Sequence, residues 1–397
     1  MHSITVYTDE IDDLELAAEE LSQKIPADFK LYKNSVGIIY CDVETDEVEL
    51  VKALRAYYDF PILGATAVAL LTTNEGYNDV GIAFMIMTCD DYEYAATITE
   101  ELTLANVDAE ISKAYNNLLG QITQKPQLAL ILAPQMEDVT GDFIVQSFNK
   151  ACDNKLPLFG GIASDSFTMA DNRIFFNEES SRRKVVLVML AGDFQPIYQQ
   201  HYTIIDTKDH MYTVTKSKDN VVYELEQGRF LDVLRSTGMD VNEVDAYLKF
   251  VGTVFEANIT MPNGETISVM RDIHTINFED GSAIMLGNVP VGSKMRLCML
   301  TKENITRSVK QAFDDVLAQI KAHPEHQYTT ILCASCAGRF LNLSSEPDAE
   351  GKAYQGLLPQ GISLAGMYSF GEIYPTLMQD GSSFNIFHNK TFTLVAF

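Results

Sequence analysis

The sequence has few basic residues for its length. Its 397 residues include 29 Lys and Arg against 55 Asp and Glu, which gives a formal net charge of −26 at pH 7. A surface of this charge repels phosphate backbones and anionic lipids, so we expect neither nucleic acid nor a membrane as a partner. No apolar run approaches the ~20 residues that span a bilayer, and the start of the chain lacks the basic and apolar segments of a signal peptide. We therefore expect a cytoplasmic protein.

Paired metal-binding motifs are also missing. Six cysteines are scattered along the chain, and only Cys333 and Cys336 form a C-x-x-C motif. A structural zinc site needs two more ligands at matching spacing, and the sequence has no second C-x-x-C and no paired histidine motif. Scattered cysteines in a large chain are typical of reduced thiols. We predict no disulfide framework, no metal and no cofactor.

Three segments repeat the order strand, helix, strand and strand, at residues 36–87, 128–190 and 329–397. Strand-helix-strand order predicts parallel pairing with right-handed crossovers, whereas the short links between strands predict antiparallel neighbours. Residues 212–300 instead read as short strands joined by tight turns, which predicts an antiparallel meander. We predict an α/β protein of two lobes, residues 1–195 and 196–397, with mixed, partly parallel sheets flanked by helices and the meander in the second lobe.

A glycine follows an apolar residue at the same place in each repeat, at Gly64, Gly160 and Gly366. Glycine inside a strand usually marks a bulge, or a point where another backbone or a ligand approaches closely. Since the glycine recurs at matching places, we expect it to serve the architecture, and glycines alone do not identify a site.

Arg339 is the strongest candidate for recognition. It follows Ala337 and Gly338 at the end of a buried strand, where open sheets bind ligands, and its planar fork suits a carboxylate or phosphate. An amino acid ligand also needs a carboxylate for its ammonium group, and the acidic residues nearby are Glu346, Glu350 and Glu372. Tyr368 would supply an apolar wall. The structural alternative is an internal ion pair of Arg339 with Glu346 or Glu372.

Cys336 is a candidate nucleophile because Arg339 would lower its pKa. No histidine follows it closely in the sequence, so a general base would have to come from elsewhere in the fold, such as His274 or His388. A redox role for the Cys333 and Cys336 pair is disfavoured, because residues three apart on a strand face opposite sides. The alternative function is a thiol-dependent hydrolase or transferase.

Two motifs carry a resemblance to a known family. Cys336-Ala337-Gly338-Arg339 and the run from Gly366 to Ile373 resemble signatures of the FIST C domain. Upstream, Pro61-Ile62-Leu63-Gly64 and the run from Pro157 to Asp165 are similar to the FIST N domain. The resemblance covers most of the chain after about residue 30.

The resemblance implies an intracellular sensory module of signal transduction that binds a small ligand such as an amino acid. No output domain is attached to these two lobes, so we expect the signal to pass through a downstream signalling protein or through self-association. A third function class is a scaffold whose acidic surface binds a basic partner. The residues expected to bind the ligand are Arg339, Gly338, Cys336, Glu346, Gly366, Tyr368, Gly371, Glu372, Gly160, Gly161 and Asp165.

Overall fold

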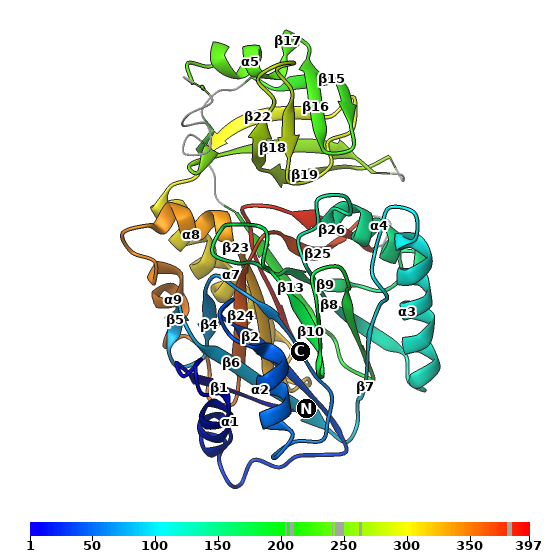
Figure 1. Cartoon of the computed structure of the whole chain (residues 1–397), viewed down its shortest axis with the longest axis vertical. Helices are drawn as coiled ribbons and strands as arrows, with labels where there is room; N and C mark the ends of the chain where they lie inside the picture. The colour runs from blue at the N-terminus through cyan, green and yellow to red at the C-terminus, as the bar shows by residue number, and fades with distance from the viewer. Residues whose placement is uncertain (203–204, 207–209, 240, 243–249, 262–263, 379–382) are drawn as a thin grey trace.

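Two bodies are visible in the computed structural model, which describes residues 1–202, 205–206, 210–239, 241–242, 250–261, 264–378 and 383–397 (Figure 1). The lower body in Figure 1 holds three six-stranded mixed sheets, and we call it the three-sheet body. The upper body holds one nine-stranded sheet within residues 205–299, and we call it the upper domain. The chain leaves the three-sheet body for the upper domain and then returns to it.

The three sheets of the lower body share one plan. Each has an outer strand, an antiparallel return strand, two parallel strands and a hairpin, in that order. The first sheet contains β1 (His2–Thr8), β6 (Ile82–Cys89), β2 (Asn34–Cys41), β3 (Ile62–Thr66), β10 (Ile174–Phe176) and β11 (Glu179–Ser181). The second contains β7 (Glu93–Ile98), β12 (Val186–Ala191), β8 (Pro126–Ala133), β9 (Leu158–Ile162), β25 (Glu372–Leu377) and β26 (Ser383–His388). The third contains β13 (Ile197–His201), β27 (Phe392–Ala396), β23 (Thr330–Cys336), β24 (Ser363–Ser369), β4 (Leu70–Thr72) and β5 (Gly76–Asn78).

Each repeat lends its hairpin to another repeat. The β4–β5 hairpin follows β3 in the chain but pairs with β24, the β10–β11 hairpin follows β9 but pairs with β3, and the β25–β26 hairpin follows β24 but pairs with β9. This exchange closes a ring of three sheets. Ile38, Leu130 and Leu332, from the first parallel strand of each sheet, accordingly belong to one shared buried cluster. The three repeats therefore form one body with a common core.

The recurring glycines allow close contact between the two parallel strands of each sheet. The residues opposite Gly64, Gly160 and Gly366 in the register are Ile39, Ile131 and Cys333. A Cβ atom on these glycines would lie 2.2, 1.9 and 2.7 Å from the carbonyl oxygen of the opposite residue. Any side chain would collide with backbone at the same point of all three sheets, so the glycines serve the architecture, as the sequence predicts.

Helices cover the outer faces of the sheets: α1 (Leu14–Gln23) and α2 (Glu47–Leu54) on the first, α3 (Val107–Gln121) and α4 (Gly141–Ala151) on the second, and α7 (Lys302–Ala322), α8 (Ala337–Leu343) and α9 (Ala349–Tyr354) on the third. The longest, α7, begins with a capping box between Thr301 and Asn304, which satisfies free amide groups at its first turn. Val309 and Phe313 lie on its buried stripe. The third sheet is thus closed on its outer face, where the predicted site residues are concentrated.

The upper domain is entirely antiparallel, which confirms the antiparallel pairing predicted for this segment. Its elements are β14 (Ile205–Asp206), β15 (Tyr212–Lys218), β16 (Val221–Leu225), β17 (Gly228–Arg229), α5 (Phe230–Ser236), β18 (Thr253–Thr260), β19 (Thr266–Arg271), β20 (Ile273–Ile276), β21 (Ala283–Met285) and β22 (Lys294–Met299). In its sheet, β22 lies between β18 and β15. The buried cluster of the upper domain also includes Ile386 of β26 in the three-sheet body. The mixed α/β class and the repeated units are confirmed, whereas the division into lobes at residues 195 and 196 stays a prediction. Among the described residues, no helix combines the length and apolarity needed to cross a membrane.

Candidate functional site

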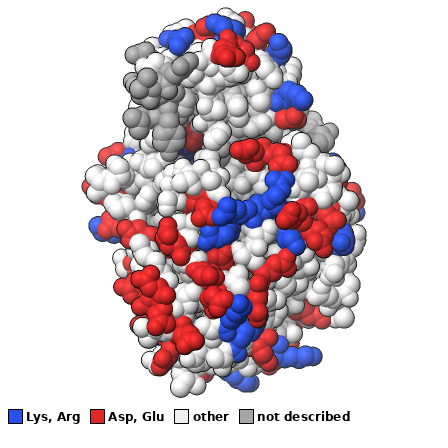
Figure 2. Space-filling view, viewed as in Figure 1, with Lys and Arg blue, Asp and Glu red and all other residues white. Residues whose placement is uncertain are grey.

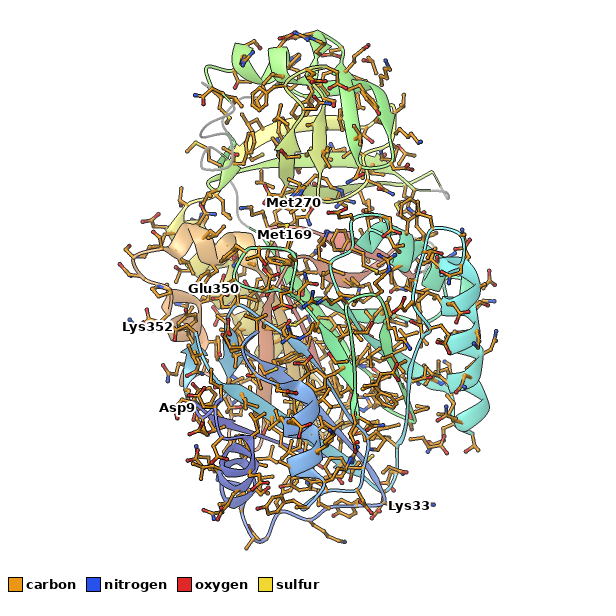
Figure 3. All side chains as sticks on the ribbon, viewed as in Figure 1. Asp9, Lys33, Met169, Met270, Glu350 and Lys352 are labelled. Carbon is orange, nitrogen blue, oxygen red and sulfur yellow. The ribbon has the colours of Figure 1, made fainter. Side chains whose placement is uncertain are left out.

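Arg339 lies inside the fold. It follows the end of β23 on α8, and both its side chain and that of Glu350 on α9 are 0% exposed. The guanidinium donates from Nε to Glu350 Oε1 at 2.9 Å, and Nη2 lies 2.7 Å from the same oxygen. Nη2 also donates to Ser308 Oγ of α7 at 2.9 Å. Figure 3 shows Glu350 within the body, whereas Lys352 of the same helix points out from it.

The surroundings of this ion pair are aromatic. The rings of Phe340 and Tyr368 lie 5.5 Å apart, and the guanidinium lies 5.9 Å from the centre of the Phe392 ring. Burial and the charge of Glu350 hold the pKa of Tyr368 well above its usual value. The fork of Arg339 therefore joins α8, α9 and α7 instead of facing solvent. The structural alternative of an internal ion pair is the arrangement found, but its predicted partners were wrong.

Glu346 and Glu372 have other partners. Glu346 is half exposed and pairs with Lys302. Glu372 is fully buried, accepts from Ser369 Oγ at 2.8 Å and from Thr391 Oγ1 at 2.7 Å, and burial raises its pKa to about 8. The residue at the same register position is Leu70 in the third sheet and Ile174 in the first, so Glu372 is a carboxyl where the repeats otherwise have an aliphatic side chain.

Cys336 and Gly338 line a small pocket where the three-sheet body meets the upper domain, which we call the junction pocket. Across it, Lys390 Nζ lies 3.2 Å from Asp272 Oδ2 of the upper domain and donates to Gly338 O at 3.1 Å. The volume of the pocket is about 50 Å³, far below the ~300 Å³ at which ligand pockets begin. In Figure 3, Met169 and Met270 lie on either side of this boundary.

The thiols are not activated. Cys333 and Cys336 are both buried, and burial raises the pKa of each well above the usual value. Glu372 raises the pKa of Cys336 further, and Lys390 only partly opposes these effects. A thiol in such surroundings stays protonated at neutral pH, so it is a poor nucleophile.

The remaining predicted site residues have packing roles. Gly161 lies opposite Glu372 across β9 and β25, and a Cβ on Gly371 would collide with the Phe387 ring. The Asp165 carboxylate accepts from the backbone amides of residues 168–171, which fixes the loop around it and lowers its pKa despite burial. Phe167, in that loop, packs against Phe340 at 6.0 Å. Asp165 therefore holds the loop that forms one wall of the junction pocket.

A larger cavity lies on the same boundary, between α4, β18, β19 and β26, and we call it the interface groove. Its volume is about 460 Å³, which is within the range for small-molecule sites. Ile259, Ile267 and Val269 of the upper domain form one wall, and Phe384 and Phe387 of the three-sheet body face them. Both bodies thus contribute to this groove.

A buried ion pair borders the interface groove. Arg271 Nη2 of β19 donates to Asp142 Oδ1 at the start of α4 at 3.3 Å, and the two side chains are 2% and 11% exposed. Asn288 N donates to Asp142 Oδ2 at 2.7 Å. Burial raises the pKa of Asp142 and lowers that of Arg271, and each partner opposes the shift of the other. Asn288 Oδ1 has no hydrogen-bond partner in the described part of the chain.

Sequence reasoning missed this groove because its residues come from distant parts of the chain. One signal was present: Arg271 and Asp272 interrupt an apolar strand pattern, and adjacent opposite charges there indicate buried pairing. Sequence reasoning also missed Asn149. Its side chain donates to the backbone carbonyl of Asn385 and accepts from the backbone amide of Asn385, and so caps the outer edge of β26. Within the described ranges, no cluster of three or more His, Cys, Asp or Glu side chains is placed to hold a metal ion.

Two family models match the chain. The FIST N domain model matches residues 35–227 and the FIST C domain model matches residues 231–375. No curated protein matches the chain.

Two solved structures of cyanuric acid hydrolase show a weak likeness. One, described as evolutionary innovation by structural concatenation, aligns over 100% of this chain and 99% of its own, with 9% identity and a TM-score of 0.32. The other, from A. caulinodans, aligns over 66% of this chain and 82% of its own, with 8% identity and a TM-score of 0.26. These TM-scores support no inference about activity.

Proposed function

Because this chain belongs to the FIST family of signal-transduction sensor domains, we propose that it binds a small zwitterionic or anionic ligand in the interface groove. The observation that carries the proposal is the volume of about 460 Å³ between the two bodies, bordered by the Arg271 and Asp142 pair. Arg339, which the sequence favoured, is fully buried against Glu350. We therefore assign recognition of a ligand carboxylate to Arg271 instead.

The groove has the groups that an amino acid requires. Asp142 and the free Asn288 Oδ1 would receive an ammonium group, and Arg271 would face a carboxylate. The apolar walls, which include Ile267 and Phe384, would hold an aliphatic or aromatic side chain. An amino acid with an apolar side chain meets all three conditions.

Sensing would follow from the position of the groove. Two buried ion pairs cross the boundary between the bodies, Arg271 with Asp142 and Asp272 with Lys390. A ligand that bonds to Asp142 competes with the first pair and alters how the upper domain rests on the three-sheet body. Such a change can be passed on only if the ligand prefers one arrangement over the other. We place the protein in the cytoplasm, with a downstream signalling protein or a second copy as the receiver.

Thermal shift measurements against amino acids and related small anions test this proposal. A ligand present at ~100 times its Kd stabilises the protein by about 2.7 kcal/mol, enough for a clear rise in Tm. Asp142→Asn should abolish the shift, and so should Val145→Phe, which fills the groove from α4. Asp108→Asn is the matched control, because Asp108 pairs with Lys150 at the surface with 62% of its side chain exposed. Hits that survive both groove variants would place the site elsewhere.

The alternative of a thiol-dependent enzyme has its own test. It requires a reactive Cys336, whereas burial raises the pKa of this thiol. We expect iodoacetamide to modify Cys336 at neutral pH no faster than the other buried cysteines, as mass spectrometry would measure. Rapid and selective labelling of Cys336 would favour the enzyme.

A further inference from the structure

A second groove lies far from the upper domain, and we call it the β1 groove. It is lined by residues 4–7 of β1, residues 73–75 between β4 and β5, and residues 355–356 and 358–363 after α9. Its volume is about 760 Å³, and Lys24 and Pro26 also line it. The groove lies outside both the interface groove and the junction pocket, so the proposed ligand site makes no use of it.

One wall of the β1 groove is the edge of a sheet. β1 is the first strand of its sheet, and among the described strands it pairs only with β6. Two of its carbonyl groups accept hydrogen bonds from outside the sheet: Ser3 O from Ser363 Oγ at 3.0 Å, and Tyr7 O from Lys24 Nζ at 2.7 Å. Backbone groups two residues apart in an antiparallel strand point to the same side. The peptide groups of Thr5, midway between Ser3 and Tyr7, therefore belong to this open edge.

Thr5 carries a second unused group. Thr5 lines the groove and is 6% exposed, yet its hydroxyl has no hydrogen-bond partner among the described residues. A buried hydroxyl without a partner costs free energy unless a bound molecule supplies one. The side-chain caps at Ser3 and Tyr7 thus leave both backbone and side-chain positions of Thr5 for an occupant.

The rim of the β1 groove is negative. Glu75 lines the groove together with Tyr7. Burial, together with the charges of Asp9, Glu75 and Asp79, raises the pKa of Tyr7 to about 12, so all three carboxylates act electrostatically on this side chain. Lys24 is the basic residue that lines the groove. Figure 2 shows further acidic side chains at the lower left, over the position of α1 in Figure 1, and Figure 3 places Asp9 on that side. The potential around the groove favours a basic occupant.

We propose that the β1 groove binds an extended basic segment of a partner protein, which adds a strand to β1 at Thr5. Main-chain hydrogen bonds to an open edge supply affinity in this mode of recognition, and side chains supply specificity. Here lysine or arginine side chains of the segment would meet Asp9, Glu75 and Asp79 at the rim. This surface would give the proposed sensor a route to a separate protein.

Fluorescence anisotropy with a labelled short peptide of alternating lysine and valine residues tests the proposal on the full chain. We expect saturable binding that weakens as salt is added. Methylating the backbone nitrogens on one edge of the peptide should weaken binding about tenfold, because main-chain hydrogen bonds are lost while charge is kept. Replacing lysine with glutamate should abolish binding.

Variants of the protein locate the site. The double variant Glu75→Gln with Asp79→Asn should weaken binding of the peptide about fivefold through the loss of two charges. Asp153→Asn, which changes a surface carboxylate paired with Lys155, should leave binding unchanged. Thr5→Pro removes the edge amide, and its folding is checked by thermal melting. No binding, equal binding of the methylated peptide, or an unchanged Kd in the rim variant would each overturn the proposal.

Discussion

The molecule contains two buried arginine–carboxylate pairs in different surroundings, and only one of them borders the proposed ligand site. Arg339 and Glu350 are 0% exposed and join neighbouring helices within one body. Arg271 and Asp142 are 2% and 11% exposed, join two bodies, and border a cavity of about 460 Å³. The chemistry of the two pairs is the same. What differs is whether a ligand can reach the pair and whether breaking it changes the fit of one body on the other.

The comparison shows that residue type alone does not mark a site. An arginine and a carboxylate can bind a zwitterionic ligand between them, or they can form an ion pair with each other. Where no ligand can reach them, only the ion pair is possible. Arg339 has Glu350, Ser308 and the Ile305 carbonyl as partners, which fixes α8 against α7. Arg271 instead bonds to the backbone of Met270, Phe387 and Asn288, which holds its fork beside the groove. Its pair is the better placed to respond to a ligand.

Breaking the Arg339–Glu350 pair, which we call the sealed pair, gives the largest expected effect on stability. Glu350→Ala leaves the Arg339 charge buried without its partner, and we expect the free energy of unfolding in urea to fall by about 3–5 kcal/mol. The double variant Arg339→Met with Glu350→Leu should regain most of this loss, because it removes both charges together.

The control is Glu346→Ala, which removes a surface carboxylate that lies between α8 and α9 and pairs with Lys302 of α7, and it should change stability by no more than about 0.5 kcal/mol. If Glu350→Ala costs no more than Glu346→Ala, the sealed pair contributes nothing to stability and the contrast with the groove fails.

The next largest expected effect is a dependence of stability on pH, and it comes from Glu372, another fully buried carboxyl of the three-sheet body. Burial raises its pKa in the folded protein to about 8 from 4.5. The folded state then keeps a proton that the unfolded state releases, so the contribution of Glu372 to stability is greatest below pH 4.5 and is lost as pH rises towards 8. Between pH 4.5 and 7 we expect a loss of about 3 kcal/mol from this group.

Glu372→Gln should remove that loss, which urea unfolding at several pH values would measure as a difference between variant and parent. The difference matters because His388 acts in the opposite direction. Burial lowers its pKa to about 3 from 6.5, so its contribution to stability increases between those pH values in both proteins. A variant with the same pH profile as the parent would show that Glu372 is ionised in the fold.

The sequence allowed the architecture of each repeat to be predicted, but not the connections between repeats. Strand and helix order and the recurring glycines are local patterns, and the backbone contacts of Gly64, Gly160 and Gly366 explain why they recur. The exchange of hairpins among the sheets is set by packing between segments as far apart as Leu71 and Gly366. No local pattern encodes such a pairing, so the closed ring was beyond prediction.

The candidate site divides in the same way. Sequence reasoning found Cys336 and Gly338, which do lie at the boundary of the two bodies, because a strand end followed by glycine is a local signal. It did not identify Glu350 as the partner of Arg339, since the fold of the segment after α8 decides which of several nearby carboxylates turns inward. It missed Asp142 and Arg271 altogether, because 129 residues separate them and only the docking of the upper domain brings them together.

The smallest expected effect comes from loosening the groove pair. Asp142→Asn keeps the shape of the side chain and its bond with the Asn288 amide, and both Asp142 and Arg271 line the interface groove. We therefore expect a loss of only about 1–2 kcal/mol in the free energy of unfolding. Glu350→Gln, the same change in the Arg339–Glu350 pair, should cost more, because Glu350 is 0% exposed whereas Asp142 lines the interface groove. Equal losses for the two variants would mean that the groove is as dry as the sealed pair, and Asp142 would then be no more available to a ligand than Glu350 is.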